Sequence, residues 1–79
     1  MVTVEIIKPD GTLCDKLEHI NKITYRTQLP GNTNFVELTT DEDFITHEFR
    51  HYSTINFYSD SGNYLVDKKM IGVLKITKE

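Results

Sequence analysis

The residues best suited to catalysis form one short motif, His47-Glu48-Phe49-Arg50-His51, which fits the pattern H-E-x-x-H. On a helix, two histidines four positions apart project from the same face and can hold Zn²⁺, while the glutamate between them acts as general base. His47 and His51 are therefore candidate metal ligands for a zinc-dependent hydrolase, with Glu48 as the base. This chemistry also needs a third protein ligand and a cleft for the substrate.

The rest of the chain weakens the zinc hypothesis. Arg50 places a charge inside a segment that should lie buried beneath the metal, and the remaining histidine, His19, precedes the motif. A third ligand would have to be acidic, and the candidates are Asp60, Asp67 and Glu79. Because a five-residue pattern of this kind also arises by chance, we expect no catalytic residue and no cofactor, and keep the hydrolase as an alternative.

Size and composition indicate a single small domain spanning residues 1–79. A chain of 79 residues buries little more than about 60% of its unfolded surface, so the core is modest. The one cysteine, Cys14, cannot form an internal disulfide, and we expect it to be a packing residue. We find no targeting or membrane-spanning pattern, which predicts a cytoplasmic protein without membrane partners.

Charge bears on the choice of partner. The net charge of −3 disfavours nucleic acid, which usually selects a basic surface. Aromatic side chains could nevertheless stack bases on a small barrel that binds single-stranded nucleic acid, and we keep this as a second alternative. On alternating strands, however, most such residues belong to the core. Tyr58, which follows Phe57, is the aromatic residue that we expect to be exposed; the others considered are Tyr25, Phe35 and Tyr64.

Most of the elements that must position these residues are short strands. Val2, Val4 and Ile6 alternate with polar residues, and the turn signal at 9–12 predicts a first hairpin that returns through residues 12–14. Residues 15–21 could be a strand or a helical turn. The other predicted strands are 22–29, 35–38, 55–58, 64–66 and 71–76, with turns at 30–32 and 59–63 and a polar link at 67–69.

Residues 39–52 form the predicted helix. Thr39 or Thr40 can cap it, with Glu42 or Asp43 three residues further on, and acidic residues suit the first turn. The alternative is a strand through residues 45–49. The predicted fold is thus α+β, mainly β: a small antiparallel meander or barrel of six to seven short strands, with one short helix near residues 40–52.

Two features concern the last strand. Gly72 interrupts its apolar pattern and indicates a bulge or a close approach between backbones. Four lysines around this strand could protect a sheet edge from pairing with another chain: Lys68, Lys69, Lys75 and Lys78.

These observations favour a non-enzymatic protein-interaction module. It would bind an unknown protein by surface complementarity, or add an edge strand to a partner or to a copy of itself. The candidate binding residues are Tyr58 and the acidic run Asp41, Glu42 and Asp43. The small size, mild acidity and β-rich pattern are typical of proteins encoded by bacteria, phages and other mobile elements.

Overall fold

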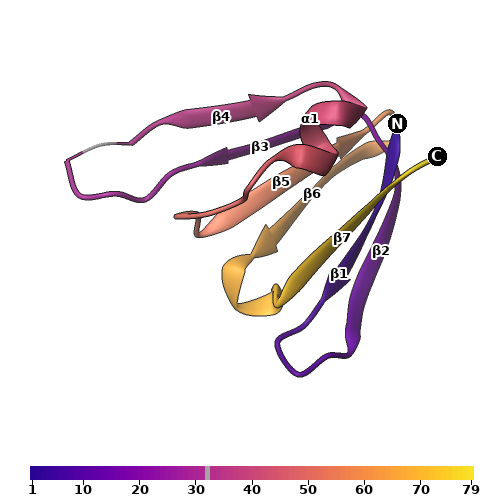
Figure 1. Cartoon of the computed structure of the whole chain (residues 1–79), viewed down its shortest axis with the longest axis horizontal. Helices are drawn as coiled ribbons and strands as arrows, with labels where there is room; N and C mark the ends of the chain where they lie inside the picture. Colours follow the sequence, from indigo (N-terminus) through magenta and orange to yellow (C-terminus); the bar gives the residue numbers. More distant parts are fainter. Residues whose placement is uncertain (32) are drawn as a thin grey trace.

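The computed structural model describes residues 1–31 and 33–79, which form seven strands, one α-helix and one 3₁₀ turn. The strands make two antiparallel sheets, one of three strands and one of four, that share a core (Figure 1). This confirms the predicted fold, mainly β with six to seven short strands and one short helix. The strands form two sheets rather than one continuous meander.

The three-stranded sheet contains both ends of the chain. Its strands are β1 (Val2–Ile7), β2 (Leu13–Ile20) and β7 (Val73–Lys78), in the order β2-β1-β7. The predicted first hairpin is confirmed, since the Lys8 N–H donates to the Thr12 carbonyl at 2.8 Å across the turn. Alternate residues of β1 are buried, as their period of two requires.

The four-stranded sheet carries the surface discussed below. Its order is β4-β3-β5-β6, with β3 (Lys22–Arg26), β4 (Phe35–Leu38), β5 (Thr54–Ser59) and β6 (Gly62–Asp67). The predicted turn between β5 and β6 is confirmed. Of the predicted turn at 30–32, Pro30 and Gly31 do lie in a turn, while Asn32 lies outside the described residues.

Residues 15–20 of the ambiguous segment 15–21 are strand and belong to β2, and Asn21 joins β2 in one sheet to β3 in the other. In the β1–β2 register Val2 pairs with Ile20 and Val4 with Leu17, so β2 has one extra residue at this point. His19 takes up the bulge with a φ of 59°. The bulge explains the misleading sequence pattern, because it lets Leu17 and Ile20 both face the core at a helix-like spacing of three.

The helix is confirmed but is shorter than predicted. α1 (Asp41–Thr46) is capped by Thr40, whose side chain accepts a hydrogen bond from the Asp43 N–H at 3.2 Å. It ends at Thr46, the C-cap residue His47 has extended backbone angles, and residues 47–52 are neither helix nor strand. The expected continuation to residue 52 is therefore wrong. α1 packs near β7 and buries Phe44 in the core.

Gly72 lies where two backbones meet, as predicted. Its N–H donates to the Ile7 carbonyl at 2.6 Å, and a Cβ at this position would lie 2.8 Å from the Lys8 carbonyl oxygen. The polar link before it includes a 3₁₀ turn, η1 (Lys68–Met70). Lys75 and Lys78 lie on β7, which is an edge strand, so their placement fits the edge-protection hypothesis.

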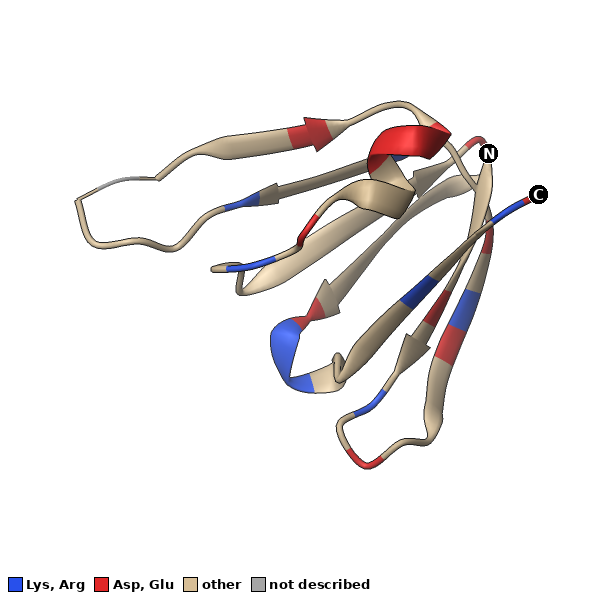
Figure 2. Cartoon of the chain, viewed as in Figure 1, with Lys and Arg blue, Asp and Glu red and all other residues tan. Residues whose placement is uncertain are grey.

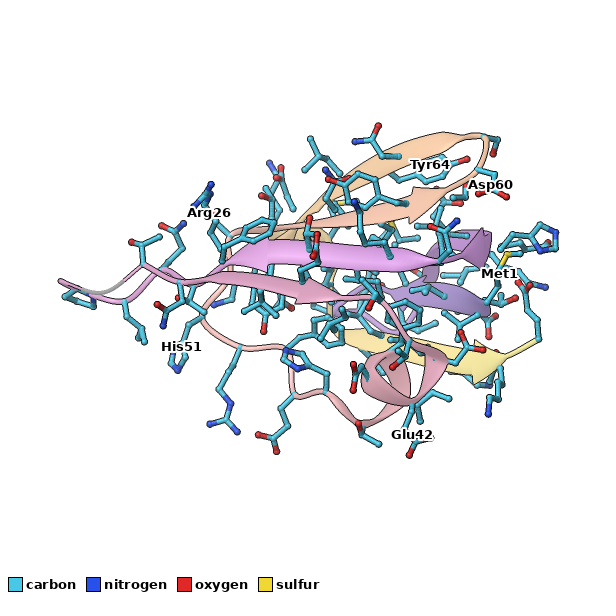
Figure 3. All side chains as sticks on the ribbon, turned by 90° about the horizontal axis from the view of Figure 1, so that it is seen from above. Met1, Arg26, Glu42, His51, Asp60 and Tyr64 are labelled. Atoms are coloured by element: carbon cyan, nitrogen blue, oxygen red, sulfur yellow. The ribbon has the colours of Figure 1, made fainter. Side chains whose placement is uncertain are left out.

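Acidic and basic residues gather on different elements of the fold. The acidic run colours the start of α1, and lysines colour η1 and β7 (Figure 2). Side chains project on all sides of the two sheets, with Glu42 on α1 and Tyr64 on β6 well apart (Figure 3).

Cys14 packs against the core as expected. In the described residues, no helix has the length and apolar character needed to span a membrane.

Candidate functional site

The H-E-x-x-H motif does not have the geometry that zinc chemistry requires. α1 ends at Thr46, so His47 and His51 do not stand one helical turn apart on a common face. His51 lies in a bend and has a φ of 60°. Glu48 forms an exposed ion pair with Arg50. The helical placement of the candidate metal ligands is therefore wrong.

His47 has a structural partner instead. Its Nε2 lies 2.6 Å from the Tyr25 hydroxyl, and we assign the hydroxyl as donor to a neutral ring. The His47 ring also contacts Phe49 edge-on, with ring centroids 4.8 Å apart. Burial lowers the pKa of His47 and raises that of Tyr25. Tyr25 thus anchors the irregular segment after α1 to the core.

The acidic residues considered as third ligands lie elsewhere. Asp60 accepts a hydrogen bond from the Asn21 side chain at 2.9 Å, and Glu79 binds both the backbone and the ring of His19. Among the described residues, no group of three or more histidine, cysteine or acidic side chains is placed to hold a metal ion.

His47 and His19 should titrate on opposite sides of the ordinary histidine pKa of 6.5. Burial lowers the pKa of His47, whereas the bond to Glu79 raises that of His19. NMR of the ring nuclei between about pH 5 and pH 8 measures both. A His47 ring that titrates above His19 would contradict the Tyr25 contact and the burial.

The two histidines also affect stability with opposite sign. The folded state favours neutral His47. The contribution of His47 to the free energy of unfolding is therefore full above pH 6.5 and declines as the pH falls below that value. The folded state favours charged His19, so its contribution is present below pH 6.5 and is lost as the pH rises through the raised pKa.

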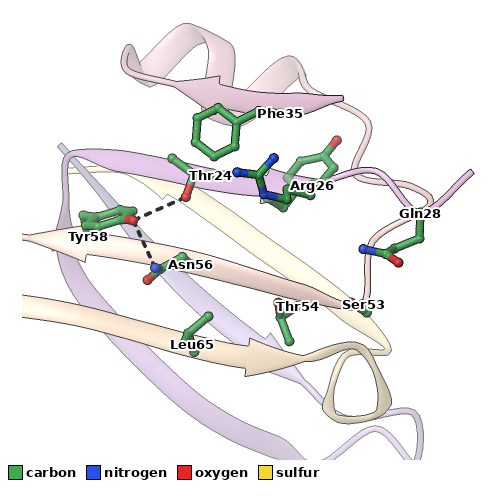
Figure 4. A pocket seen from close by; sticks show the side chains of 10 residues that line it. Thr24, Arg26, Gln28, Phe35, Ser53, Thr54, Asn56, Tyr58 and Leu65 are labelled. Carbon is green, nitrogen blue, oxygen red and sulfur yellow. Dashed lines mark hydrogen bonds between the residues drawn. The ribbon is translucent and has the colours of Figure 1, made fainter. Parts of the chain in front are cut away.

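A shallow hollow lies on the outer face of the four-stranded sheet, the face turned away from the core. We call it the outer hollow; its volume is about 270 Å³. Thr24, Asn56 and Thr54 form its floor, and Phe35 on β4 and Leu65 on β6 stand on either side (Figure 4). Phe35 is 56% exposed and Leu65 68% exposed, so both present apolar surface to solvent.

The polar groups of the floor are already arranged. The Tyr58 hydroxyl accepts a hydrogen bond from Asn56 Nδ2 at 3.0 Å and lies 3.5 Å from Thr24 Oγ1 (Figure 4). Asn63 Nδ2 donates to Asn56 Oδ1 at 3.1 Å. These bonds fix the orientations of side chains that could otherwise rotate. The floor is therefore organised before any ligand arrives, which lowers the entropic cost of binding.

Cations cover the two outward aromatic rings. Lys22 Nζ lies 4.5 Å from the centroid of the Tyr58 ring, and Arg26 Cζ lies 5.3 Å from that of Phe35. In each pair the cation occupies a ring face that a stacked base would need. This arrangement disfavours the base-stacking platform considered from the sequence.

The structure does not bring the predicted binding residues onto one surface. Tyr58 lies in the outer hollow and is half-buried, whereas the acidic run belongs to α1, beside β7 of the other sheet. Asp41 is bound to the amino group of Met1 at 2.9 Å. Tyr58 and the acidic run are thus separate candidates.

The prediction that Tyr58 is the exposed aromatic residue is wrong. Phe35 and Tyr64 are exposed, while Tyr58 is shielded by Lys22 and its hydrogen bonds. Strand register is the reason: Phe35 pairs with Arg26, whose side chain faces outward because its neighbour Tyr25 faces inward. A pairing of β3 with β4 deduced from the short connection between them would have been the signal for Phe35.

Comparison of the chain with protein-family models, with curated proteins and with solved structures gave no match. We therefore infer function from the chemistry of the two candidate sites. The motif segment is a packed aromatic cluster around Tyr25. The outer hollow offers apolar walls and a hydrogen-bonding floor, which suits reversible binding of an extended chain.

Proposed function

We propose that this chain is a non-enzymatic protein-interaction module whose outer hollow receives an extended segment of a partner protein. The observation that carries the proposal is the pair of exposed apolar side chains, Phe35 and Leu65, on either side of a pre-ordered polar floor. Covering each of them would contribute about 1–2 kcal/mol to binding, since each is already partly covered.

The floor suits a polypeptide. Its hydroxyl and amide groups can pair with the peptide groups of a bound segment, while the apolar walls contact alternate side chains. A zinc-dependent hydrolase finds less support, because its motif leaves the helix at His47. Addition of a strand to the edge of β6, beside Leu65, is a related mode and can also serve association between copies.

The proposal is tested by affinity capture from a lysate of the organism that encodes the chain. Immobilised parent protein is compared with Phe35→Ser and Leu65→Ser, and with Val73→Ser as a matched control. Val73 is 57% exposed on the other sheet, so its replacement removes similar apolar surface elsewhere. We expect proteins retained by the parent and by Val73→Ser to fall at least about tenfold on both hollow variants.

Equal recovery on all four columns would show that the outer hollow does not bind the partner. Tyr58→Ala and Asp43→Lys are run separately, because these residues lie on different surfaces. Loss of the retained proteins with Asp43→Lys alone would show that the partner binds the acidic run.

A further inference from the structure

The outer hollow continues into a second hollow at η1. The second hollow has a volume of about 640 Å³ and is lined in part by Tyr52, Lys68 and Lys69. The two hollows adjoin, because both are lined by Gln28, Ser53 and Thr54, and we call them together the outer groove. It runs along β5 from Tyr58 to η1.

The register of β5 sets the distances within the outer groove. Asn56 pairs with Leu65, and Thr54 pairs with Asp67. The Lys68 N–H donates to the Ser53 carbonyl at 2.8 Å, which holds η1 at the start of β5. Asn56 and Ser53 are three residues apart, which is about 10 Å along an extended chain, so an extended segment would cover this length in about three residues.

The two ends of the outer groove differ in charge. The end between Phe35 and Leu65 has apolar walls over a polar floor, while the η1 end carries Lys68 and Lys69. The lining also includes the positive charge of Arg26 and the negative charge of Asp67. The charged side chains of the groove therefore sum to a positive charge, although the net charge of the chain is −3. Figure 2 shows the η1 lysines away from the acidic start of α1.

We propose that the partner segment is an extended acidic peptide. It places one apolar side chain between Phe35 and Leu65 and, about three residues further on, a carboxylate against Lys68 and Lys69. This inference rests on the proposed function and names the chemistry of the partner. Charge complementarity supports it, because a carboxylate is attracted to the paired ammonium groups and a basic segment is repelled.

A peptide fits the outer groove better than a nucleic acid does. Stacking of bases would require displacement of Lys22 from Tyr58 and of Arg26 from Phe35. Asp67 would also repel a phosphate backbone at the η1 end, where it lines the same depression. An acidic peptide carries charge at its glutamates alone, whereas a nucleic acid carries a phosphate at every nucleotide.

The test is an NMR titration of the ¹⁵N-labelled whole chain with three probes. The first is the peptide acetyl-Thr-Leu-Thr-Ser-Glu-Glu-amide, the second replaces both glutamates with lysine, and the third is a short deoxythymidine oligonucleotide. We expect saturable amide shifts along the outer groove with the acidic peptide. The dissociation constant should rise at least about tenfold in the double variant Lys68→Gln/Lys69→Gln.

Lys75→Gln/Lys78→Gln is the matched control, because it removes the same charge from β7, outside the groove, and should bind like the parent. Equal binding of the lysine peptide, tighter binding of the oligonucleotide, or no groove shifts at millimolar acidic peptide would each overturn the inference. If lysate capture fails with Leu65→Ser but survives Lys68→Gln/Lys69→Gln, the proposed function stands and the acidic partner is wrong.

Discussion

Replacement of Phe44 with alanine is expected to lower the free energy of unfolding by about 3–5 kcal/mol. Phe44 is 1% exposed and is the buried residue of α1, so its ring is what fastens the helix to the core. A domain of 79 residues has a total stability of about 4–12 kcal/mol, so this loss would bring it close to unfolding at ordinary temperature.

The control for Phe44→Ala is the neighbouring change Ile45→Ala. Ile45 is 46% exposed on the same short helix, and its truncation should cost less than about 1 kcal/mol. Urea unfolding followed by circular dichroism measures both variants. Similar losses for the two would show that α1 is held by its cap and backbone and not by the Phe44 ring.

Gly72→Ala is expected to lower the free energy of unfolding by about 2–3 kcal/mol, and the melting temperature by roughly 10–20 °C. The added Cβ would lie 2.8 Å from the Lys8 carbonyl oxygen and 2.8 Å from Pro9 N, both backbone atoms that cannot rotate away. The start of β7 would have to move from β1, which would strain the bond from Gly72 to Ile7.

Gly11→Ala separates this steric effect from the general cost of replacing glycine. A Cβ at Gly11 meets nothing within 4 Å, and its φ of 90° makes the cost conformational, about 1 kcal/mol. Thermal unfolding of the two variants is the measurement. If Gly72→Ala is no more damaging than Gly11→Ala, the close approach of the two backbones is wrong.

Local patterns in the sequence predict most of the strands and the start of the helix. Alternation defines β1 and β5, and Thr40 caps α1 as its residue type indicates. The end of α1 could not be predicted, because tertiary contacts decide it. Tyr25 lies far away in sequence, yet it binds His47 and packs against Phe49, which draws the chain out of the helix.

The candidate site was only partly predictable for the same reason. Tyr58 was identified from its place beside Phe57, and it does line the outer hollow. No local pattern identified Phe35 or Leu65, because their exposure depends on which strands pair and in what register. The charged end of the outer groove depends on the contact between η1 and β5, which no local pattern encodes.

The most direct test of the central claim is a map of the binding surface. Amide shifts of the labelled chain are recorded with and without a protein retained in the lysate capture. We expect the largest changes along the outer groove, on β3, β4, β5, β6 and η1. Changes confined to the acidic run of α1, to residues 47–51, or to the three-stranded sheet would contradict this expectation.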